Sequence, residues 1–209
     1  MHKTRVKICG ITSVEDACEA ASAGADALGL VFFAKSPRFV SLESARQIVQ
    51  AVGPFIQTVG LFVNADKKQV EETIRETGID LLQFHGDEGE DFCNSFSRPY
   101  IKAIRMQADI DPDFVASQFG SARGLLFDAY SENRYGGTGE TFNWQRLPQQ
   151  CDYPLILAGG LNPDNVGEAV ATVRPYAVDV SGGVESSPGN KSSALVKRFI
   201  ENAKAGDFP

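Results

Sequence analysis

A cysteine ends a short apolar run near the start of the chain, within the sequence KICGIT at residues 7–12. Gly10 interrupts the run directly after Cys9, and a helix start follows. An ionised thiol is a good nucleophile and base, and an enclosed α/β fold would place a reactive side chain at such a junction. A buried strand cysteine without a chemical role is the alternative, and for an isolated residue it is the more common case.

Other residues with chemical potential follow similar apolar runs. His85 ends the run IDLLQFH, and Asp128 lies at the end of GLLFDA. Two glycine pairs follow the last two runs, in Gly159-Gly160 and in Ser181-Gly182-Gly183. Backbone N–H groups of such turns can bind a phosphate without any side-chain charge. A role in the turn alone is the alternative, because tight connections also favour glycine.

A third glycine cluster lies in a long loop that extends to residue 139. Its members Gly137, Thr138 and Gly139 are candidates for phosphate binding, because this loop could fold over the same region. The three clusters together predict a phosphorylated small molecule as the ligand.

Eight apolar runs rich in Val, Ile, Leu and Phe divide the chain. They begin at Arg5, Ala27, Gln57, Ile79, Tyr100, Gly124, Pro154 and Tyr176. Successive starts lie roughly 20–30 residues apart, which suits a strand, a loop and a crossover helix and is too long for hairpins. Continuous apolar runs are typical of parallel strands that are covered on both faces.

Helix signals occupy the gaps between the runs. Thr12 and Glu15 match a capping box with Thr12 as the N-cap, and Gly24 would end that helix. Further N-caps are expected at Ser41, Asp66 and Asn162, the last of them before a proline.

Eight β-α units with right-handed crossovers predict an α/β fold in which residues 1–209 form a single-domain (β/α)8 TIM barrel. A doubly wound open sheet is the competing architecture. The number of units and the lack of a G-x-G-x-x-G motif after the first run disfavour it.

Composition narrows the function classes. The net charge is −7 and no basic cluster occurs, so nucleic acid is not an expected partner. No apolar stretch approaches the ~18 residues of a membrane span, and no hydrophobic signal region is found. The four cysteines lack metal-ligand spacing, which predicts reduced thiols, no metal, no cofactor and a cytoplasmic location.

Strand alternation predicts which side chains face the barrel interior. Lys7 and Cys9 share one face of their strand, and Asp179 and Ser181 share one face of theirs. Barrel closure makes the first and eighth strands neighbours. We therefore expect Lys7 to pair with Asp179, since a buried ammonium needs a partner charge.

Seven motifs together resemble the phosphoribosylanthranilate isomerase family of tryptophan biosynthesis. They are KICGIT (residues 7–12), FFAKSPR (32–38), LQFHG (82–86), FD (127–128), GGTG (136–139), LAGGL (157–161) and DVSGGVE (179–185). The resemblance covers essentially the whole chain. One difference is that Ser181-Gly182-Gly183 stands where relatives have a second serine.

The resemblance implies an Amadori rearrangement of N-(5-phosphoribosyl)anthranilate to 1-(2-carboxyphenylamino)-1-deoxy-D-ribulose 5-phosphate, the third step from chorismate to tryptophan. It implies Cys9 as general base, Asp128 as general acid and Arg38 as the residue that binds the anthranilate carboxylate. A free thiol titrates near ~8.5 and a free aspartate near ~3.9, so at neutral pH each starts largely in the wrong protonation state. Lys7 could favour the thiolate of Cys9.

Several alternatives stay open on the sequence alone. His85 could contact the substrate or make a structural hydrogen bond. The chain could be another sugar-phosphate isomerase or epimerase, although such enzymes more often use paired carboxylates or a metal. It could also be a non-catalytic phosphate-binding barrel, which would have no need of Cys9, Asp128 and Arg38 together. A monomer and a homodimer are both compatible with the sequence.

Overall fold

The computed structural model describes residues 3–107, 109–129, 143–148 and 151–206. Its eight parallel strands close into one barrel, with each strand paired to the next along the chain and the eighth paired to the first. They are β1 (Arg5–Cys9), β2 (Ala27–Val31), β3 (Gln57–Phe62), β4 (Leu81–Phe84), β5 (Tyr100–Met106), β6 (Leu125–Ala129), β7 (Leu155–Leu157) and β8 (Ala177–Val180). The predicted TIM barrel is confirmed, and the open-sheet alternative is excluded.

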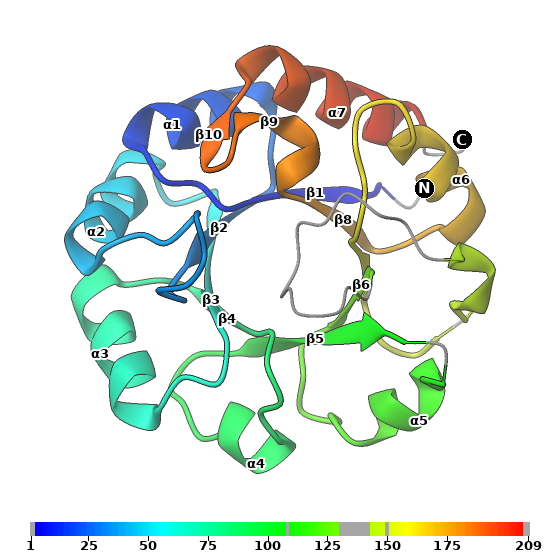
Figure 1. Ribbon diagram of the computed structural model, residues 1–209, viewed down its shortest axis with the longest axis horizontal. Helices are drawn as coiled ribbons and strands as arrows, with labels where there is room; N and C mark the ends of the chain where they lie inside the picture. Colours follow the sequence, from blue (N-terminus) through cyan, green and yellow to red (C-terminus); the bar gives the residue numbers. More distant parts are fainter. Residues whose placement is uncertain (1–2, 108, 130–142, 149–150, 207–209) are drawn as a thin grey trace.

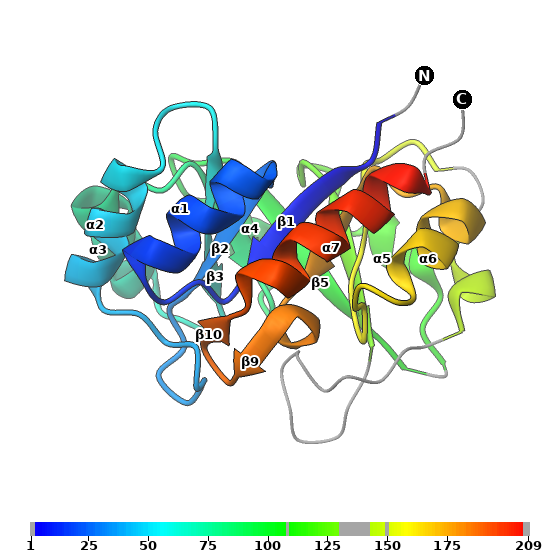
Figure 2. The same cartoon turned by 90° about the horizontal axis from the view of Figure 1, so that it is seen from above.

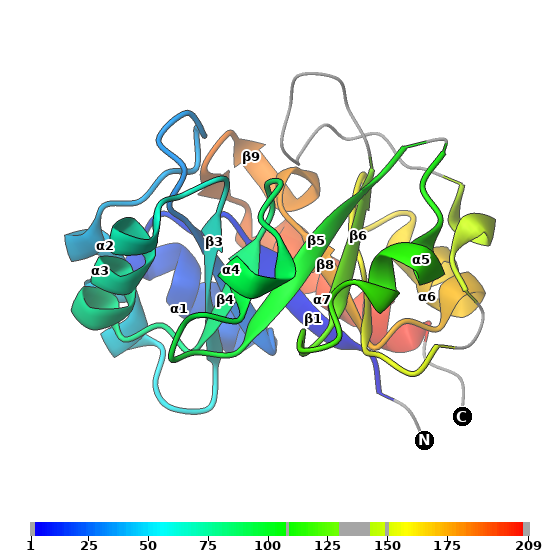
Figure 3. The same cartoon turned by 90° about the horizontal axis from the view of Figure 1, so that it is seen from below.

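Helices form a ring around the strands (Figure 1). They are α1 (Val14–Ala23), α2 (Leu42–Ala51), α3 (Lys67–Thr77), α4 (Glu90–Cys93), α5 (Pro112–Ser117), α6 (Val166–Val173), α7 (Ser193–Ala205) and the short 3-10 segment η1 (Trp144–Arg146). A second 3-10 segment, η2 (Gly182–Val184), follows β8 at the cavity. A small hairpin, β9 (Glu185–Ser187) and β10 (Asn190–Lys191), follows η2. Figures 2 and 3 show β9 at the end of the barrel toward which the strands point.

Two helix starts differ from the sequence prediction. Ser13, not Thr12, is the N-cap of α1, and its hydroxyl accepts from the backbone N–H of Asp16. Thr12 instead donates its hydroxyl to the carbonyl of Gly189 at 2.6 Å, a contact between distant segments that local sequence does not reveal. Asn162 is likewise not an N-cap, because α6 begins at Val166 with Asn165 as its cap.

The remaining helix signals are confirmed. Ser41 and Asp66 accept from backbone N–H groups at the starts of α2 and α3. Gly24 ends α1 in the left-handed conformation, with φ +98°. None of the helices in the described residues has both the length and the apolar character that a bilayer crossing requires.

The barrel interior divides into an apolar part and a polar part. Apolar side chains pack together inside, among them Val59, Ile101, Leu126 and Ile156. A separate, larger core of apolar side chains fills the space between the strands and the helices. Polar interior side chains lie on β1, β4, β6 and β8, and they are Lys7, Gln83, Asp128 and Asp179. The fold therefore places the Lys7–Asp179 ion pair and the Asp128 carboxyl in the interior toward the strand ends, where barrel enzymes carry their chemistry.

Candidate active site

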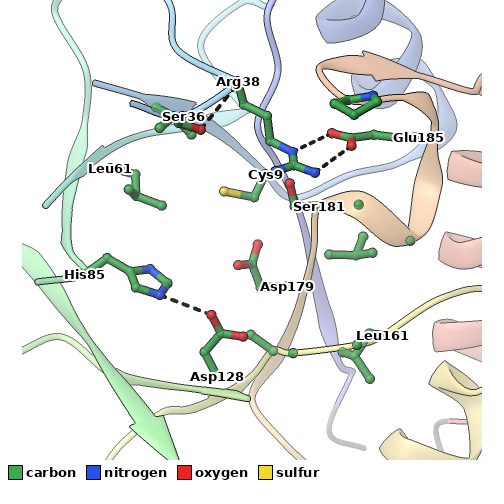
Figure 4. Close-up of a pocket in the computed structure, with 18 of the residues that line it drawn as sticks. Cys9, Ser36, Arg38, Leu61, His85, Asp128, Leu161, Asp179, Ser181 and Glu185 are labelled. Atoms are coloured by element: carbon green, nitrogen blue, oxygen red, sulfur yellow. Dashed lines mark hydrogen bonds and ion pairs between the residues drawn. The ribbon is translucent and has the colours of Figure 1, made fainter. Parts of the chain in front are cut away.

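A cavity of about 460 Å³ opens at the end of the barrel where the strands terminate. Its lining includes every predicted site residue that the structure describes, namely Cys9, Arg38, His85, Asp128, Gly159, Gly160, Ser181, Gly182 and Gly183. Figure 4 shows Cys9 and Asp128 on different walls with the cavity between them. Gly137, Thr138 and Gly139 lie outside the described residues. Residues from six different segments of the chain thus meet in one place, as the sequence predicted.

Lys7 and Asp179 form a buried ion pair beside Cys9. β1 and β8 pair with Lys7 opposite Asp179, and Lys7 Nζ lies 2.8 Å from Asp179 Oδ1. Burial favours the neutral amine, but the Asp179 carboxylate, with the Cys9 thiolate when it forms, outweighs burial and raises the pKa of Lys7 to about 12. Lys7 is therefore a permanent cation, and the predicted pairing is confirmed.

Close packing around Cys9 fixes its position. Gly29 of β2 lies opposite Cys9 in the sheet. A Cβ atom at Gly29 would approach Cys9 Sγ to 2.7 Å and Lys7 Nζ to 3.1 Å. Only a residue without a side chain therefore leaves room for the thiol and the ammonium together.

The ionisation of Cys9 differs from the simplest expectation. Burial raises the pKa of the Cys9 thiol, and the Lys7 ammonium lowers it without cancelling the effect of burial. The Asp179 carboxylate adds a smaller increase to the pKa of Cys9. Lys7 thus acts in the expected direction, but the net shift favours the protonated thiol.

Asp128 is held by His85, and His85 is held by Gln83. His85 Nε2 lies 3.1 Å from Asp128 Oδ2, and Gln83 Nε2 lies 3.1 Å from His85 Nδ1 (Figure 4 shows the first contact). All three side chains are buried. His85 therefore makes a hydrogen bond inside the site, while it also lines the cavity.

Arg38 makes a bidentate ion pair with Glu185. Its Nε and Nη2 each lie 2.7 Å from a carboxylate oxygen of Glu185. Lys191 Nζ also contacts Glu185, at 2.8 Å, and donates to the carbonyl of Ser181 at 3.1 Å. The ion pair uses two of the five N–H donors of the guanidinium. One N–H on Nη1 and one on Nη2 remain as a second donor pair, the outer fork of Arg38.

The loops after β7 and β8 form one side of the cavity. Gly159 has φ +84°, and a Cβ there would collide with the backbone N of Ala129. A Cβ at Gly183 would collide with the carbonyl of Leu161. Ser181 Oγ is buried and has no hydrogen-bond partner within the described residues. Packing therefore explains these two glycines, whereas the unpaired hydroxyl points to a ligand.

Sequence reasoning missed three residues of this site. Glu185 ends the motif DVSGGVE at residues 179–185, but no role was predicted for it, and Lys191 was not considered. The turn Ser187-Pro188-Gly189 is a local signal for the hairpin that brings Lys191 back to Glu185. Gln83 lies two residues before His85 and so on the same face of β4, which could have identified it.

No group of three or more His, Cys, Asp or Glu side chains in the described part of the chain is arranged to hold a metal ion. The expectation of a metal-free enzyme stays a prediction.

Comparison with known proteins gives one consistent result. The profile of the N-(5'phosphoribosyl)anthranilate (PRA) isomerase family matches residues 6–202. The N-(5'-phosphoribosyl)anthranilate isomerase of Pseudomonas savastanoi is 54% identical over 200 residues, which are 96% of this chain and 97% of the relative. The enzyme of the same name from Pseudomonas aeruginosa is 53% identical over 205 residues, 98% of this chain and 97% of the relative.

Solved structures agree with the sequence comparison. The phosphoribosyl anthranilate isomerase of Thermotoga maritima has a TM-score of 0.85 and 38% identity, covering 96% of this chain and 98% of its own. A phosphoribosyl anthranilate isomerase structure in complex with reduced 1-(o-carboxyphenylamino)-1-deoxyribulose 5-phosphate has a TM-score of 0.82 and 37% identity over 96% of this chain and 98% of its own. The chain therefore belongs to the N-(5'-phosphoribosyl)anthranilate isomerase family, whose members isomerise this compound in tryptophan biosynthesis.

Proposed function

We propose that Cys9 is the general base and Asp128 the general acid of this isomerisation. The observation that carries the assignment is that the two side chains face one cavity from β1 and β6. Asp128 gives its proton to the ribose ring oxygen, and the ring opens to an iminium ion at C1. Cys9 then takes the proton from C2, and the C–H electron pair forms the C1–C2 double bond of an enolamine. The enolamine tautomerises to the 1-(2-carboxyphenylamino)-1-deoxy-D-ribulose 5-phosphate product.

Lys7 assists the base by its charge. Its ammonium stays protonated and stabilises the thiolate of Cys9 electrostatically. Asp179 compensates the charge of Lys7 and keeps the ammonium in place at 2.8 Å. Removal of the C2 proton thus depends on a small thiolate population that Lys7 enlarges.

The two ends of the substrate use different walls of the cavity. We assign the phosphate to the backbone of Gly159, Gly160, Gly182 and Gly183 together with the unpaired hydroxyl of Ser181. Gly137, Thr138 and Gly139 remain part of the proposed phosphate site. The outer fork of Arg38 binds the anthranilate carboxylate in the bidentate geometry that suits a guanidinium. His85 contributes as the partner of Asp128.

The test is turnover of freshly prepared N-(5-phosphoribosyl)anthranilate by the wild type, Cys9→Ser and Asp128→Asn. Loss of general acid or base catalysis is worth about 10²–10⁴-fold in kcat, so each variant should lose at least that much. An inactive wild type would instead favour a non-catalytic phosphate-binding barrel. A wild type that turns over only other sugar phosphates would favour a different isomerase or epimerase. A variant with normal kcat would remove its residue from the mechanism.

We also propose that residues 1–209 act as one domain in the cytoplasm and assemble as a homodimer. The four cysteines are free thiols, which suits a reducing compartment. The Thermotoga maritima relative is described as dimeric. Phe55, in the loop after α2, is 97% exposed and is the candidate contact. Light scattering on wild type and Phe55→Ser should give a dimer and a weakened dimer, and a monomeric wild type would refute the assembly.

A further inference from the structure

Glu185 is the centre of a buried network of two cations and one carboxylate. One oxygen of Glu185 contacts both Arg38 Nε, at 2.7 Å, and Lys191 Nζ, at 2.8 Å. The other oxygen contacts Arg38 Nη2 at 2.7 Å. The side chains are 14%, 5% and 2% exposed for Arg38, Glu185 and Lys191. The network is nearly dry and carries one surplus positive charge.

Arg38 has little freedom inside this network. Its aliphatic stem crosses Gly10, where a Cβ atom would approach Arg38 Cδ to 2.5 Å and Ser181 Oγ to 2.9 Å. Figure 4 shows the guanidinium facing Glu185 close to Cys9. Because Glu185 holds the N–H groups of Nε and Nη2, the outer fork has a fixed direction. A fixed fork binds a carboxylate with less loss of side-chain entropy than a mobile one.

Lys191 connects Glu185 to the loop after β8. Its ammonium donates to Glu185 and to the carbonyl of Ser181, and its backbone N–H donates to Asp16 of α1 at 3.2 Å. The same hairpin is fixed from the other side by the hydrogen bond from Thr12 to Gly189. The hairpin β9–β10 is therefore anchored to the start of α1, and it presents Lys191 to the site as a rigid support.

We propose that Glu185 and Lys191 are positioning residues that select the aryl carboxylate of the substrate, with Glu185 aiming the outer fork of Arg38 and Lys191 holding Glu185 against the loop after β8. This inference rests on the proposed function, in which Arg38 receives that carboxylate. The surplus positive charge of the network is the electrostatic complement of one carboxylate. Neither residue needs to touch the reacting atoms.

We expect Glu185→Gln to lose its preference for a ligand with the aryl carboxylate over one without it, while its general affinity for the ligand is kept. The two probes are reduced 1-(o-carboxyphenylamino)-1-deoxyribulose 5-phosphate and its counterpart that lacks only the ring carboxylate. Calorimetry on wild type should show tighter binding of the carboxylated probe by about 10–100-fold, the value of charge-assisted hydrogen bonds. In Glu185→Gln this ratio should fall close to one, with the affinity for the decarboxylated probe unchanged.

Lys191→Met completes the experiment through a double-mutant cycle. As a single substitution, Lys191→Met should reduce the ratio of the affinities for the two probes. In the Glu185→Gln background it should add little, because Lys191 acts through Glu185. The double variant removes the charges of Glu185 and Lys191 together. It can therefore replace Glu185→Gln in the binding measurement if that single variant fails to fold. Glu43→Gln is the matched control, since Glu43 makes an exposed ion pair with Arg46 and neither residue lines the cavity. It should leave both affinities at the wild-type values.

The outcomes separate the inference from the proposed function. An unchanged ratio in Glu185→Gln, or an equal loss of affinity for both probes, overturns the positioning role. Independent, multiplying effects of the two substitutions overturn the connection through Lys191. A wild type that binds both probes equally refutes the assignment of Arg38 itself, whatever Glu185 does.

Discussion

The imidazole of His85 bridges Gln83 and Asp128, with 3.1 Å on each side of the ring. The amide N–H of Gln83 donates to Nδ1, which leaves the ring proton on Nε2 and directs it at Asp128 Oδ2. A donor in this place stabilises negative charge on Asp128 as the proton leaves for the substrate. The hydrogen bond should therefore strengthen during the reaction.

His85→Ala should lower kcat by about 10–100-fold with little change in KM, because the interaction is strongest in the transition state. Gln83→Leu should lower kcat by a smaller factor, since it removes only the hydrogen bond that orients the imidazole ring of His85. Steady-state kinetics on the wild type and the two variants measures kcat and KM separately. A raised KM with unchanged kcat would make His85 a substrate contact and not a partner of the acid.

The pH dependence of catalysis should reflect Cys9 and Lys7. Because the reaction needs Cys9 deprotonated while Asp128 is protonated, the alkaline limb on which kcat/KM falls reports the raised pKa of Cys9 and should lie above the ordinary thiol value of ~8.5. Lys7→Met removes the cation that lowers this pKa, so the alkaline limb should move to higher pH and kcat/KM at pH 7 should fall about tenfold or more.

Folding of the Lys7→Met variant needs a separate check, because it leaves Asp179 buried without its partner. The variant Lys7→Met/Asp179→Asn removes both charges. Lys7 acts more strongly on the thiol than Asp179 does, so this double variant should shift the limb in the same direction by less. Superimposable profiles for all three proteins would exclude Lys7 from the ionisation of Cys9.

Gly29 should be as sensitive as a catalytic residue although it has no side chain. In Gly29→Ala the new Cβ must displace Cys9 Sγ, which would lie only 2.7 Å away. We expect kcat to fall about 10²-fold, the cost of misplacing a reacting group by about 1 Å. Gly120→Ala is the matched control, since no atom lies within 4 Å of a Cβ at that position. Equal activities of the two variants would show that the thiol has more room than the geometry indicates.

The stability of the barrel should depend on the charge of Glu185. Burial alone would raise the pKa of Glu185, but the hydrogen bonds from Arg38 and Lys191 outweigh it and lower this pKa. A lowered pKa means that stabilisation is present at neutral pH and is lost as the pH falls through the folded-state value. Glu185→Gln should thus lower the free energy of unfolding at pH 7 by about 3 kcal/mol, typical of a broken buried pair.

Urea unfolding at pH 7 and near pH 3 measures this effect. The difference between wild type and Glu185→Gln should shrink at the lower pH, because Glu185 of the unfolded wild type takes up a proton below its ordinary pKa of ~4.3, and this favours unfolding. The exposed Glu43→Gln variant should stay close to wild type at both pH values. A difference that is constant with pH would assign the loss to packing and not to charge.

The fold was predictable because it depends on repetition. Apolar runs at regular spacing imply β-α units, and eight units imply closure, which made the Lys7–Asp179 pair predictable from strand alternation alone. The Thr12 prediction was wrong because Gly189, 177 positions away, accepts its hydroxyl. The network of Arg38 with Glu185 was missed for the same reason, since 147 positions separate the two. Local patterns fix elements and faces, whereas partners in loops depend on the closed structure.

The seam between β1 and β8 has a consequence for how the enzyme matures. The ammonium beside Cys9 is held by a carboxylate 172 positions later, and that carboxylate arrives only when the last strand completes the ring. Ser181, Glu185 and Lys191 follow in the same final unit. An incomplete ring therefore carries its thiol without the groups that tune it or hold a ligand beside it. Activity should therefore appear only once β8 has paired with β1, and recovery of activity during refolding would report ring closure.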